Sequence, residues 1–431
     1  MASETGSDVI IAGAGPVGLL LALRLGQAGI NTIVLESQKK LLPTIRAMVY
    51  MPIVLNIFRK LDIFDTTITQ SYPNYSGVSW RDIDGNELAH LDIDSGNPYE
   101  FGGLLIIGQK RMSQLILKEI AKYPTVQVRF GEKVIDIVDD AMNQDGVKVT
   151  AQKRLKTNQI GSPPPAGTLK NYRAKYVVGA VGANSSVRQL LGIVYEGFTY
   201  DNWKMIGTNV QYDFIGHQGF SPINFIVDPV EWCAIAYTGE DEFGLDSGPG
   251  AAVWHVAYSE DPDLPDDTES IIERARRRVG RFIKTGDGKD GKGIFKVTRA
   301  EPYILQQRLA SEGRKGRVLL AGDALHCNNP IGGLGLTTGI CDAFCYGNAI
   351  VRVVKHGESD TLLTTCAQSR RHAFEQVTNE KSMENLARLQ SDESPDVEDR
   401  LEFFEKLKTD PTFHVQVKKG WDSIMEVTFE K

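Results

Sequence analysis

The N-terminal segment alternates short apolar runs with glycine-rich turns. Residues 8–12 (DVIIA) are mostly apolar and β-branched and are followed by glycine, which is typical of a short buried strand. Residues 19–29 (LLLALRLGQAG) have the composition of a buried helix, and residues 31–35 (NTIVL) predict a second strand. The order of strand, helix and strand predicts the first part of an α/β domain with a parallel sheet.

The centre of the chain shows a different pattern, in which apolar and polar residues alternate. Residues 223–228 (INFIVD), 232–238 (WCAIAYT) and 252–258 (AVWHVAY) predict strands of an antiparallel sheet with one face toward a pocket. Ordinary packing within the sheet remains an alternative for each polar side chain on these strands, and the sequence identifies no catalytic base. The candidate pocket residues are Asn224, Tyr237 and His255.

A second glycine-rich segment follows much later in the chain. Residues 316–323 (GRVLLAGD) predict a buried strand that ends on Gly-Asp. A glycine-rich loop leads from there into an apolar helix at 340–354. Beyond about residue 360 the pattern is polar and helical, so residues 361–431 are predicted to form a C-terminal helical cap.

Length and charge limit the possible functions. A chain of 431 residues is long enough for two or three packed units. The net charge of −7 argues against nucleic-acid or anionic-membrane partners, which select a clustered excess of lysine and arginine. No apolar stretch approaches the roughly 20 residues that a membrane helix needs. We therefore expect a protein without a membrane span that acts on a small molecule, in an oligomeric state that the sequence does not reveal.

The cysteines favour a reducing compartment. The chain has five cysteines, an odd number, and they are scattered, which predicts reduced thiols and a cytoplasmic location. Cys327, Cys341 and Cys345 occur close to His326 in the sequence, which suggests a metal site at first sight. That spacing lacks a paired Cys-x-x-Cys or a pair of histidines, so we expect no metal.

The glycine-rich turn after the first strand has the form of a dinucleotide site. Residues 13–18 read GAGPVG, and the second strand ends on Glu36. Gly13 permits a tight turn, Gly15 lets the backbone approach a pyrophosphate, and Gly18 lets the helix pack on the strand. The helix N-terminus offers free N–H groups to the phosphates, and Glu36 can accept hydrogen bonds from an adenosine ribose. These features fit NAD as well as FAD.

The later glycine-rich segment favours FAD. Residues 322–339 (GDALHCNNPIGGLGLTTG), with the Asp-Ala pair at 342–343, resemble the second FAD motif of the aromatic-hydroxylase type of flavin monooxygenase. Within this segment, the sequence GGLGLTT resembles that of the fungal branch of the family. In the family, the residue matching Asp323 holds a ribityl hydroxyl, and the carbonyl of the residue matching Pro330 lies by the flavin edge that carries oxygen. His326 is interpreted as a structural histidine rather than a group that transfers a proton.

Other segments resemble the same family, from about residue 8 to about residue 375. Residues 44–52 (TIRAMVYMP) resemble a segment whose arginine lies along the cofactor, and residues 107–112 (IGQKRM) align with one that supplies a polar side chain to FAD. Arg370 and Arg371 fit a paired arginine of the family. The resemblance implies these cofactor-binding residues: Gly13, Gly15, Pro16, Gly18, Glu36, Arg46, Gln109, Asp323, Gly333, Leu334, Gly335 and Leu336.

The resemblance also implies the fold and the domain division. We expect an α/β (α+β) protein of two domains, with a Rossmann-like FAD-binding domain around a parallel sheet, an antiparallel-sheet substrate domain, and C-terminal helices. The FAD-binding domain is assigned to residues 1–75, 102–190 and 300–360, and the substrate domain to residues 76–101 and 191–299.

The implied activity is that of an FAD-dependent monooxygenase. In the family, NAD(P)H docks transiently and reduces FAD, and a C4a-hydroperoxyflavin formed with O₂ hydroxylates an aromatic or phenolic substrate. The likeness to the fungal branch implies a substrate from secondary metabolism.

One position departs from the family pattern. Residues 176–188 (YVVGAVGANSSVR) align with the family motif GADG..S.VR, in which Val181 replaces the aspartate. That Asp-Gly pair is associated with the handling of both FAD and the nicotinamide donor. The alternative prediction is therefore an FAD-bound oxidase, dehydrogenase or redox-neutral cyclase or isomerase that has lost the nicotinamide step. A non-catalytic binding protein is a further alternative, against which the intact glycines and Asp323 argue.

Overall fold

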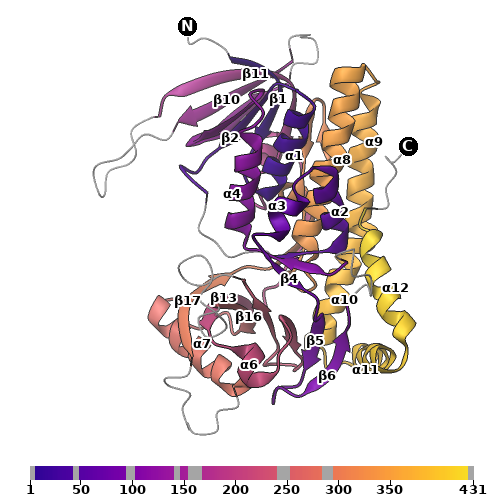
Figure 1. Cartoon of the computed structure of the whole chain (residues 1–431). Coiled ribbons are helices and arrows are strands. Elements are labelled where there is room, and N and C mark those ends of the chain that lie inside the picture. The colour runs from indigo at the N-terminus through magenta and orange to yellow at the C-terminus, as the bar shows by residue number, and fades with distance from the viewer. Residues whose placement is uncertain are drawn as a thin grey trace.

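The molecule is built around two sheets that lie toward opposite ends of an elongated shape (Figure 1). The computed structural model describes residues 5–41, 48–93, 102–139, 146–153, 167–239, 253–283 and 295–425.

The first sheet has a parallel centre. Its hydrogen-bonded order is β19-β20-β11-β1-β2-β8; in addition, β10 pairs antiparallel with the first half of β11, and β9 pairs antiparallel with β10. The pairs β20–β11, β11–β1, β1–β2 and β2–β8 are all parallel. In the described part of the chain its eight strands are β1 (Thr5–Ala12), β2 (Thr32–Glu36), β8 (Val126–Phe130), β9 (Glu132–Val138), β10 (Val147–Lys153), β11 (Leu169–Gly179), β19 (Arg314–Lys315) and β20 (Val318–Leu320).

Helix α1 (Pro16–Gln27) explains the long apolar run that follows the glycine turn. It is buried along most of its length because it lies against the parallel sheet and also packs on α4 (Gln109–Ile120) and α8 (Leu334–His356). Gly347 allows the close approach of α8, since a Cβ there would lie 2.7 Å from Cγ of Arg24. The predicted strand, helix and strand at the N-terminus are confirmed.

The second sheet is mainly antiparallel and has the order β17-β13-β16-β15-β14-β5-β6. Its one parallel pair among the described residues joins β14 to β5. The three central strands predicted from alternation are confirmed as β14, β15 and β16. The strands are β5 (Val78–Arg81), β6 (Glu87–Leu91), β13 (Lys204–Gln211), β14 (Ile223–Ile226), β15 (Cys233–Tyr237), β16 (Val253–Glu260) and β17 (Lys296–Tyr303).

Two small sheets and further helices complete the described elements. The small sheets are β3 (Val49–Tyr50), β7 (Leu104–Ile106) and β4 (Tyr72–Asn74), and β12 (Tyr195–Thr199), β18 (Gln306–Ala310) and β21 (His326–Cys327). The helices are α2 (Pro52–Lys60), α3 (Phe64–Ile68), α5 (Ser186–Leu190), α6 (Phe214–Gln218), α7 (Thr268–Phe282), the 3₁₀ turn Gly322–Ala324, α9 (Thr361–Ala373), the π-helix Phe374–Thr378, α10 (Asn379–Gln390), α11 (Ser394–Thr409) and α12 (Pro411–Asp422).

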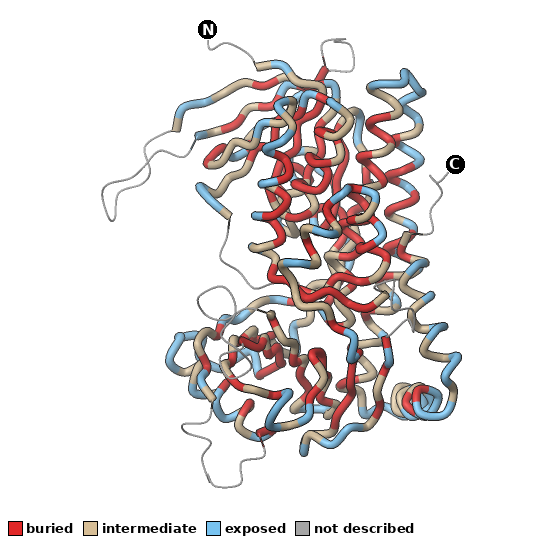
Figure 2. Tube along the Cα trace, viewed as in Figure 1, coloured by how far each residue is buried: buried red, intermediate tan, exposed pale blue. Residues whose placement is uncertain are grey.

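Buried residues run through both units of the molecule (Figure 2). They form three apolar clusters that hold the layers together. The largest joins α1, α2, α4 and α8 to one face of the antiparallel sheet, so this face looks toward the parallel-sheet unit. A second cluster lies between the other face of the antiparallel sheet and helices α6 and α7. The third covers the face of the parallel sheet opposite α1, where Ile10 and Ile33 pack against residues of β10 and β11.

The predicted fold class is confirmed: a parallel sheet with helices, an antiparallel sheet, and C-terminal helices are all present. The domain boundaries stay a prediction. β17, which crosses the expected boundary at residue 300, belongs to the antiparallel sheet, and β12 and β18 form a small sheet with β21. Among the described residues, no helix combines the length and apolar character that crossing a bilayer requires.

The expectation of reduced thiols is wrong for two of the cysteines. The structure contains a disulfide between Cys345 of α8 and Cys366 of α9, whose Cα atoms lie 6.7 Å apart. Packing of α8 on α9 brings these positions together, a juxtaposition that the spacing along the chain does not reveal. Cys233, Cys327 and Cys341 are free.

Candidate FAD site and sheet face

Three predicted site residues and Val181, the departure from the family pattern, lie at the carboxyl ends of four neighbouring parallel strands. In spatial order, β20 is followed by Asp323, β11 by Val181, β1 by Gly13, and β2 ends on Glu36. Parallel strands have their carboxyl ends at the same edge of the sheet. Ligands of such sheets bind at this edge, at the point where the strand order reverses. With strands about 4.8 Å apart, β2 and β20 are separated by roughly 14 Å, so the edge suits an extended ligand.

The three glycines of the turn after β1 differ in their surroundings: two lie against the protein backbone and one faces open space. Gly13 has φ +108°, and a Cβ there would lie 2.4 Å from the carbonyl oxygen of Ala180. A Cβ on Gly18 would lie 2.1 Å from the carbonyl oxygen of Gly13. A Cβ on Gly15, by contrast, meets no protein atom within 4 Å. The protein itself therefore requires the first and third glycines, whereas Gly15 leaves open space at the start of α1.

This open space lies where an anion is favoured. Gly15 is the N-cap of α1, no side chain caps the helix, no acidic residue stands in its first turn, and Pro16 begins it. The N–H groups of a helix start and its positive dipole end attract phosphate. The residues present thus fit the pyrophosphate of a dinucleotide.

Glu36 is held at the end of β2 beside the same turn. Its Oε2 accepts a hydrogen bond from the backbone N–H of Ala14 at 2.8 Å, and its Oε1 accepts one from the N–H of Gln38 at 2.7 Å. A carboxylate has about four acceptor positions, so Glu36 retains capacity for ribose hydroxyls. The Ser37 hydroxyl also donates to Oε1 at 3.1 Å, and these three bonds fix the carboxylate next to the glycine turn.

The second glycine-rich segment approaches the first through close packing. A Cβ on Gly322 would lie 3.1 Å from Cγ2 of Val17, and a Cβ on Gly339 would lie 2.8 Å from the same atom. The start of α1, the end of β20 and the second turn of α8 therefore meet at one point. Asp323 follows there and is exposed, and its carbonyl accepts a hydrogen bond from the Tyr195 hydroxyl at 2.8 Å.

Helix α8 is a second uncapped helix start in this region. Gly333 is its N-cap with φ +68°, no side chain caps it, and its first turn holds no acid. Of the predicted contacts, Leu334 is buried, and Gly335 and Leu336 are partly exposed. Pro330 is exposed at the beginning of the turn that leads to the helix.

Of the remaining predicted residues, Gln109 lies in the described part of the chain. Gln109 begins α4 shortly after β7 and is partly exposed. β7 pairs with β3, and Cβ of Val49 in β3 lies 4.0 Å from the Cβ position of Gly333. Arg46 lies outside the described residues. Val181 is partly buried, and its Cα lies 3.1 Å from the Cβ position of Gly13.

Arg188 lies in this region, although the sequence predicts no role for it. Its guanidinium donates to the carbonyl of Ala324 at 2.9 Å and to that of Ala183 at 2.6 Å, and it stacks over the Tyr195 ring at 3.6 Å. It therefore ties the loop after β11 to the loop after β20. Arg188 is the arginine of the motif GADG..S.VR. Its sequence neighbours do not show that its side chain joins two loops, because one of these loops is far away along the chain.

A buried ion-pair network supports the start of α8. Asp342 accepts from Arg370 Nε at 2.8 Å through Oδ1, and its Oδ2 lies 2.7 Å from Nε2 of His326 and 3.0 Å from the N–H of Gly322. Burial alone would raise the pKa of Asp342, but the charges and hydrogen bonds of His326 and Arg370 hold it below its ordinary value. The His326 ring also stacks on Phe374 at 4.7 Å. His326 is thus a buried structural residue.

The candidate pocket residues of the antiparallel sheet separate onto its two faces. His255 pairs with Asn209 and Ala236 across the sheet, on the face that looks toward the parallel-sheet unit. Tyr237 packs on Trp254 at 5.3 Å within the cluster under α6 and α7. Asn224 is fully buried, and its side-chain oxygen accepts from Arg81 Nε at 3.0 Å and from the N–H of Ser221 at 3.1 Å.

The face that carries His255 has small residues at its centre. Gly207, Ala257 and Ala234 pair in one row across β13, β16 and β15. The next row carries Arg299, Asn209, His255 and Ala236. Residues paired across strands share a face, so this face offers an apolar floor with a polar end.

The ring of His255 is neutral at physiological pH. Burial, and then the charge of Arg299, lower the pKa of His255 to about 4. Its Nδ1 lies 3.5 Å from Oδ1 of Asn209, and a Cβ on Gly207 would lie 3.1 Å from its Cε1. A neutral imidazole of this kind is a weak base that can both donate and accept a hydrogen bond.

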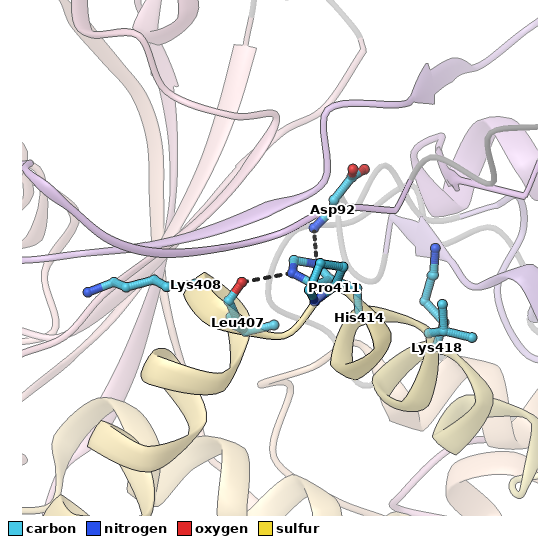
Figure 3. A pocket seen from close by; sticks show the side chains of 7 residues that line it. Asp92, Leu407, Lys408, Pro411, His414 and Lys418 are labelled. Carbon is cyan, nitrogen blue, oxygen red and sulfur yellow. Dashed lines mark hydrogen bonds between the residues drawn. The ribbon is translucent and has the colours of Figure 1, made fainter.

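A separate cavity of about 230 Å³ lies at the C-terminal helices (Figure 3). Both ring nitrogens of its His414 are engaged, one by the N–H of Asp92 at 3.0 Å and the other by the carbonyl of Leu407 at 2.8 Å. No predicted site residue lines it, and we assign it no ligand. The lining residues are Asp92, Leu407, Lys408, Pro411, His414, Val415 and Lys418. Within the described ranges, no three potential metal ligands cluster.

Comparison with known proteins adds the chemical class. The family described as FAD binding domain matches residues 6–381. The para-nitrophenol 4-monooxygenase of Pseudomonas sp. (strain WBC-3) is 34% identical over 408 residues, which cover 93% of this chain and 92% of that protein. The 6-hydroxy-3-succinoylpyridine 3-monooxygenase of Pseudomonas putida (strain DSM 28022 / S16) is 30% identical over 383 residues, 88% of each chain.

A solved structure is similar over the whole length. The crystal structure of p-nitrophenol 4-monooxygenase from Pseudomonas putida DLL-E4 aligns with a TM-score of 0.86 at 30% identity. The alignment covers 99% of this chain and 100% of that chain.

Proposed function

Because the chain belongs to the FAD binding domain family, we propose that it hydroxylates a small phenol with NAD(P)H and O₂. The resemblance to the aromatic-hydroxylase type of flavin monooxygenase is confirmed, FAD is the cofactor, and the protein is a flavin-dependent oxidoreductase. The observation that carries the proposal is the alignment of Gly13, Glu36 and Asp323 along one sheet edge.

The proposed roles of the cofactor residues follow their positions. Glu36 binds the adenosine ribose, the N–H groups at the start of α1 bind the pyrophosphate, and Asp323 binds the ribityl chain. The start of α8 would bind the flavin ring, where its dipole would favour the negative charge that develops on reduction. FAD, once bound and reduced by the nicotinamide donor, would activate O₂, one atom of which is transferred to the substrate while the other leaves as water.

The proposed substrate site is the face of the antiparallel sheet that carries His255. Ala234 and Ala257 are small and apolar and offer an aromatic ring a surface to pack on, while the rings of His255 and Tyr303 lie over Gly207. The neutral His255 orients the phenol by a hydrogen bond to its hydroxyl. We propose p-nitrophenol as the first substrate to test, because relatives at 34% and 30% identity carry that name.

The expectations of a fungal branch and a secondary-metabolite substrate stay predictions, since the relatives named above come from bacteria. The same holds for the cytoplasmic location and for the division into an FAD-binding and a substrate domain.

We expect NADPH or NADH to bleach the bound flavin within seconds under anaerobic conditions in the presence of p-nitrophenol. On admission of O₂, the phenol should be consumed and nitrite or a hydroxylated product should appear. Chromatography measures the substrate and the products. Flavin that stays oxidised with both donors, with p-nitrophenol and with other para-substituted phenols would contradict the proposal. That result would favour the redox-neutral or oxidase alternative, in which Val181 has removed the nicotinamide step.

Replacement of His255 by alanine is expected to raise KM for the phenol about tenfold and to leave the FAD absorbance spectrum unchanged, because one hydrogen bond to the substrate is lost. The matched control is His356→Ala, an exposed histidine at the end of α8. Steady-state kinetics on both variants measure the effect. A KM that is equal in the two variants would exclude His255 from substrate binding.

A further inference from the structure

The turn before α8 is closed by an asparagine that the family motif does not include. The carbonyl of Pro330 accepts a hydrogen bond from the N–H of Gly333 at 3.0 Å. The side-chain oxygen of Asn329 accepts one from the N–H of Ile331 at 3.1 Å. Asn329 is fully buried, whereas Pro330 beside it is exposed. One buried side chain thus fixes an exposed turn.

Asn329 is in turn held by two buried polar groups. Its Nδ2 donates to the carbonyl of Ser382 at 2.9 Å, and its backbone N–H donates to Oε1 of Gln307 at 3.1 Å. Nε2 of Gln307 donates to the Ser382 hydroxyl at 2.8 Å and to Oδ1 of Asn379 at 3.0 Å. Gln307 is 3% exposed and Ser382 is 0% exposed, so these bonds form away from water. Removal of one member leaves the others unpaired, which is costly in a buried site.

The hydrogen bonds of Asn329 and Gln307 end on one face of α10. Asn379, Ser382 and Asn385 follow each other at intervals of three residues and therefore share a face. Asn385 also touches the turn, because a Cβ on Gly332 would lie 2.4 Å from its Nδ2. In the sequence these residues look like the polar side of a solvated helix, but Ser382 faces the interior.

The segment just before α10 makes further contacts of the same kind. The π-helix Phe374–Thr378 places Phe374 against the ring of His326 and the Thr378 hydroxyl 2.8 Å from that of Thr338 in α8. π-helical turns are often found at functional sites. The C-terminal helical region therefore contacts the glycine-rich segment at both ends, at His326 before it and at Thr338 in α8.

We propose that Asn329 is a positioning residue for the flavin of FAD, which acts through the turn at 330–333 and is anchored on α10 by Gln307 and Ser382. The uncapped N–H groups of α8 begin at the end of this turn, so its position sets how closely the positive end of the helix approaches the bound cofactor. The residues 361–390 thus tune the cofactor instead of only covering it. This inference rests on FAD binding and is independent of the proposed substrate and of the nicotinamide step.

The experiment compares Asn329→Ala, Asn329→Ser and Ser382→Ala, with the exposed Asn56→Ala as the matched control. The readouts are the dissociation constant of FAD by fluorescence and the midpoint reduction potential of the bound flavin. Asn329→Ala is expected to weaken FAD binding about tenfold and to make the potential more negative, since the helix start is held less firmly. Asn329→Ser should recover part of both losses, because its hydroxyl can accept from the N–H of Ile331.

A purely structural role predicts a different result. Asn329→Ala would then lower the thermal midpoint of the apoprotein while the FAD-bound form kept the wild-type potential and dissociation constant, and the proposal would be overturned. If Asn329→Ala does not fold, Ser382→Ala decides, because it removes the hydroxyl that holds Nε2 of Gln307 and so loosens the side chain to which the N–H of Asn329 donates. A wild-type potential and FAD affinity in Ser382→Ala would equally overturn the proposal.

Discussion

Replacement of Gly15 by alanine is expected to weaken FAD binding about 10- to 100-fold while the apoprotein keeps its fold. The added Cβ meets no protein atom within 4 Å, so the folded chain has room for it. The same methyl group occupies the space at the start of α1 in which the pyrophosphate is proposed to lie. Isothermal titration with FAD measures the affinity, and circular dichroism measures the fold.

Gly18→Ala is the matched comparison for this effect. Its Cβ would lie 2.1 Å from the carbonyl oxygen of Gly13, so it should destabilise the apoprotein itself. FAD binding by Gly15→Ala at the wild-type dissociation constant would show that the open space is not the pyrophosphate site.

Asp342→Asn is expected to lower the free energy of unfolding by about 3–5 kcal/mol, because it leaves the buried charge of Arg370 without its partner. Asp342 is fully buried, and the backbone N–H of Gly322 also depends on its carboxylate. Urea unfolding of the apoprotein followed by circular dichroism gives the free energy. Glu358→Gln serves as the control, since it breaks an exposed pair with Arg352 and should change the stability little.

The same carboxylate gives a pH dependence of known sign. A carboxyl whose pKa is lower in the folded than in the unfolded chain stabilises the fold above the unfolded value and loses this contribution as the pH falls through the folded value. The contribution of Asp342 should therefore be complete above about pH 4 and decline below it. If wild type and Asp342→Asn lose stability in parallel on acidification, the ion pair does not act in this way.

The N-terminal strand, helix and strand and the three central strands could be predicted because each depends on short-range pattern. Apolar runs and alternation report directly on which residues face a core. The positions of Gly13 and Glu36 at adjacent strand ends also follow from the order of these elements, since a βαβ unit brings both strand ends to one edge.

The contacts between distant segments could not be predicted in the same way. Nothing in the local pattern shows that Arg370 faces Asp342 or that Cys345 lies beside Cys366, because each pair depends on how long helices pack. Asn224 and His255 look alike as polar residues on alternating strands, yet Asn224 is hydrogen-bonded to Arg81 and His255 lies on the face toward the parallel-sheet unit. The strand register and the face of the sheet on which a residue lies decide its surroundings, and both depend on the neighbouring strands.

The order of strands in the parallel sheet also bears on how the chain folds during synthesis. β1 leaves the ribosome first but occupies the centre of the sheet, and its neighbour β11 is flanked on the far side by β20 at Val318–Leu320. Helix α8, which packs on α1, follows later still. Such long-range pairing folds slowly and exposes unpaired edges meanwhile. A nascent chain that already contains the complete glycine turn therefore still lacks a strand of the sheet until β20 at Val318–Leu320 has emerged, and its need for chaperones should be greatest over that interval.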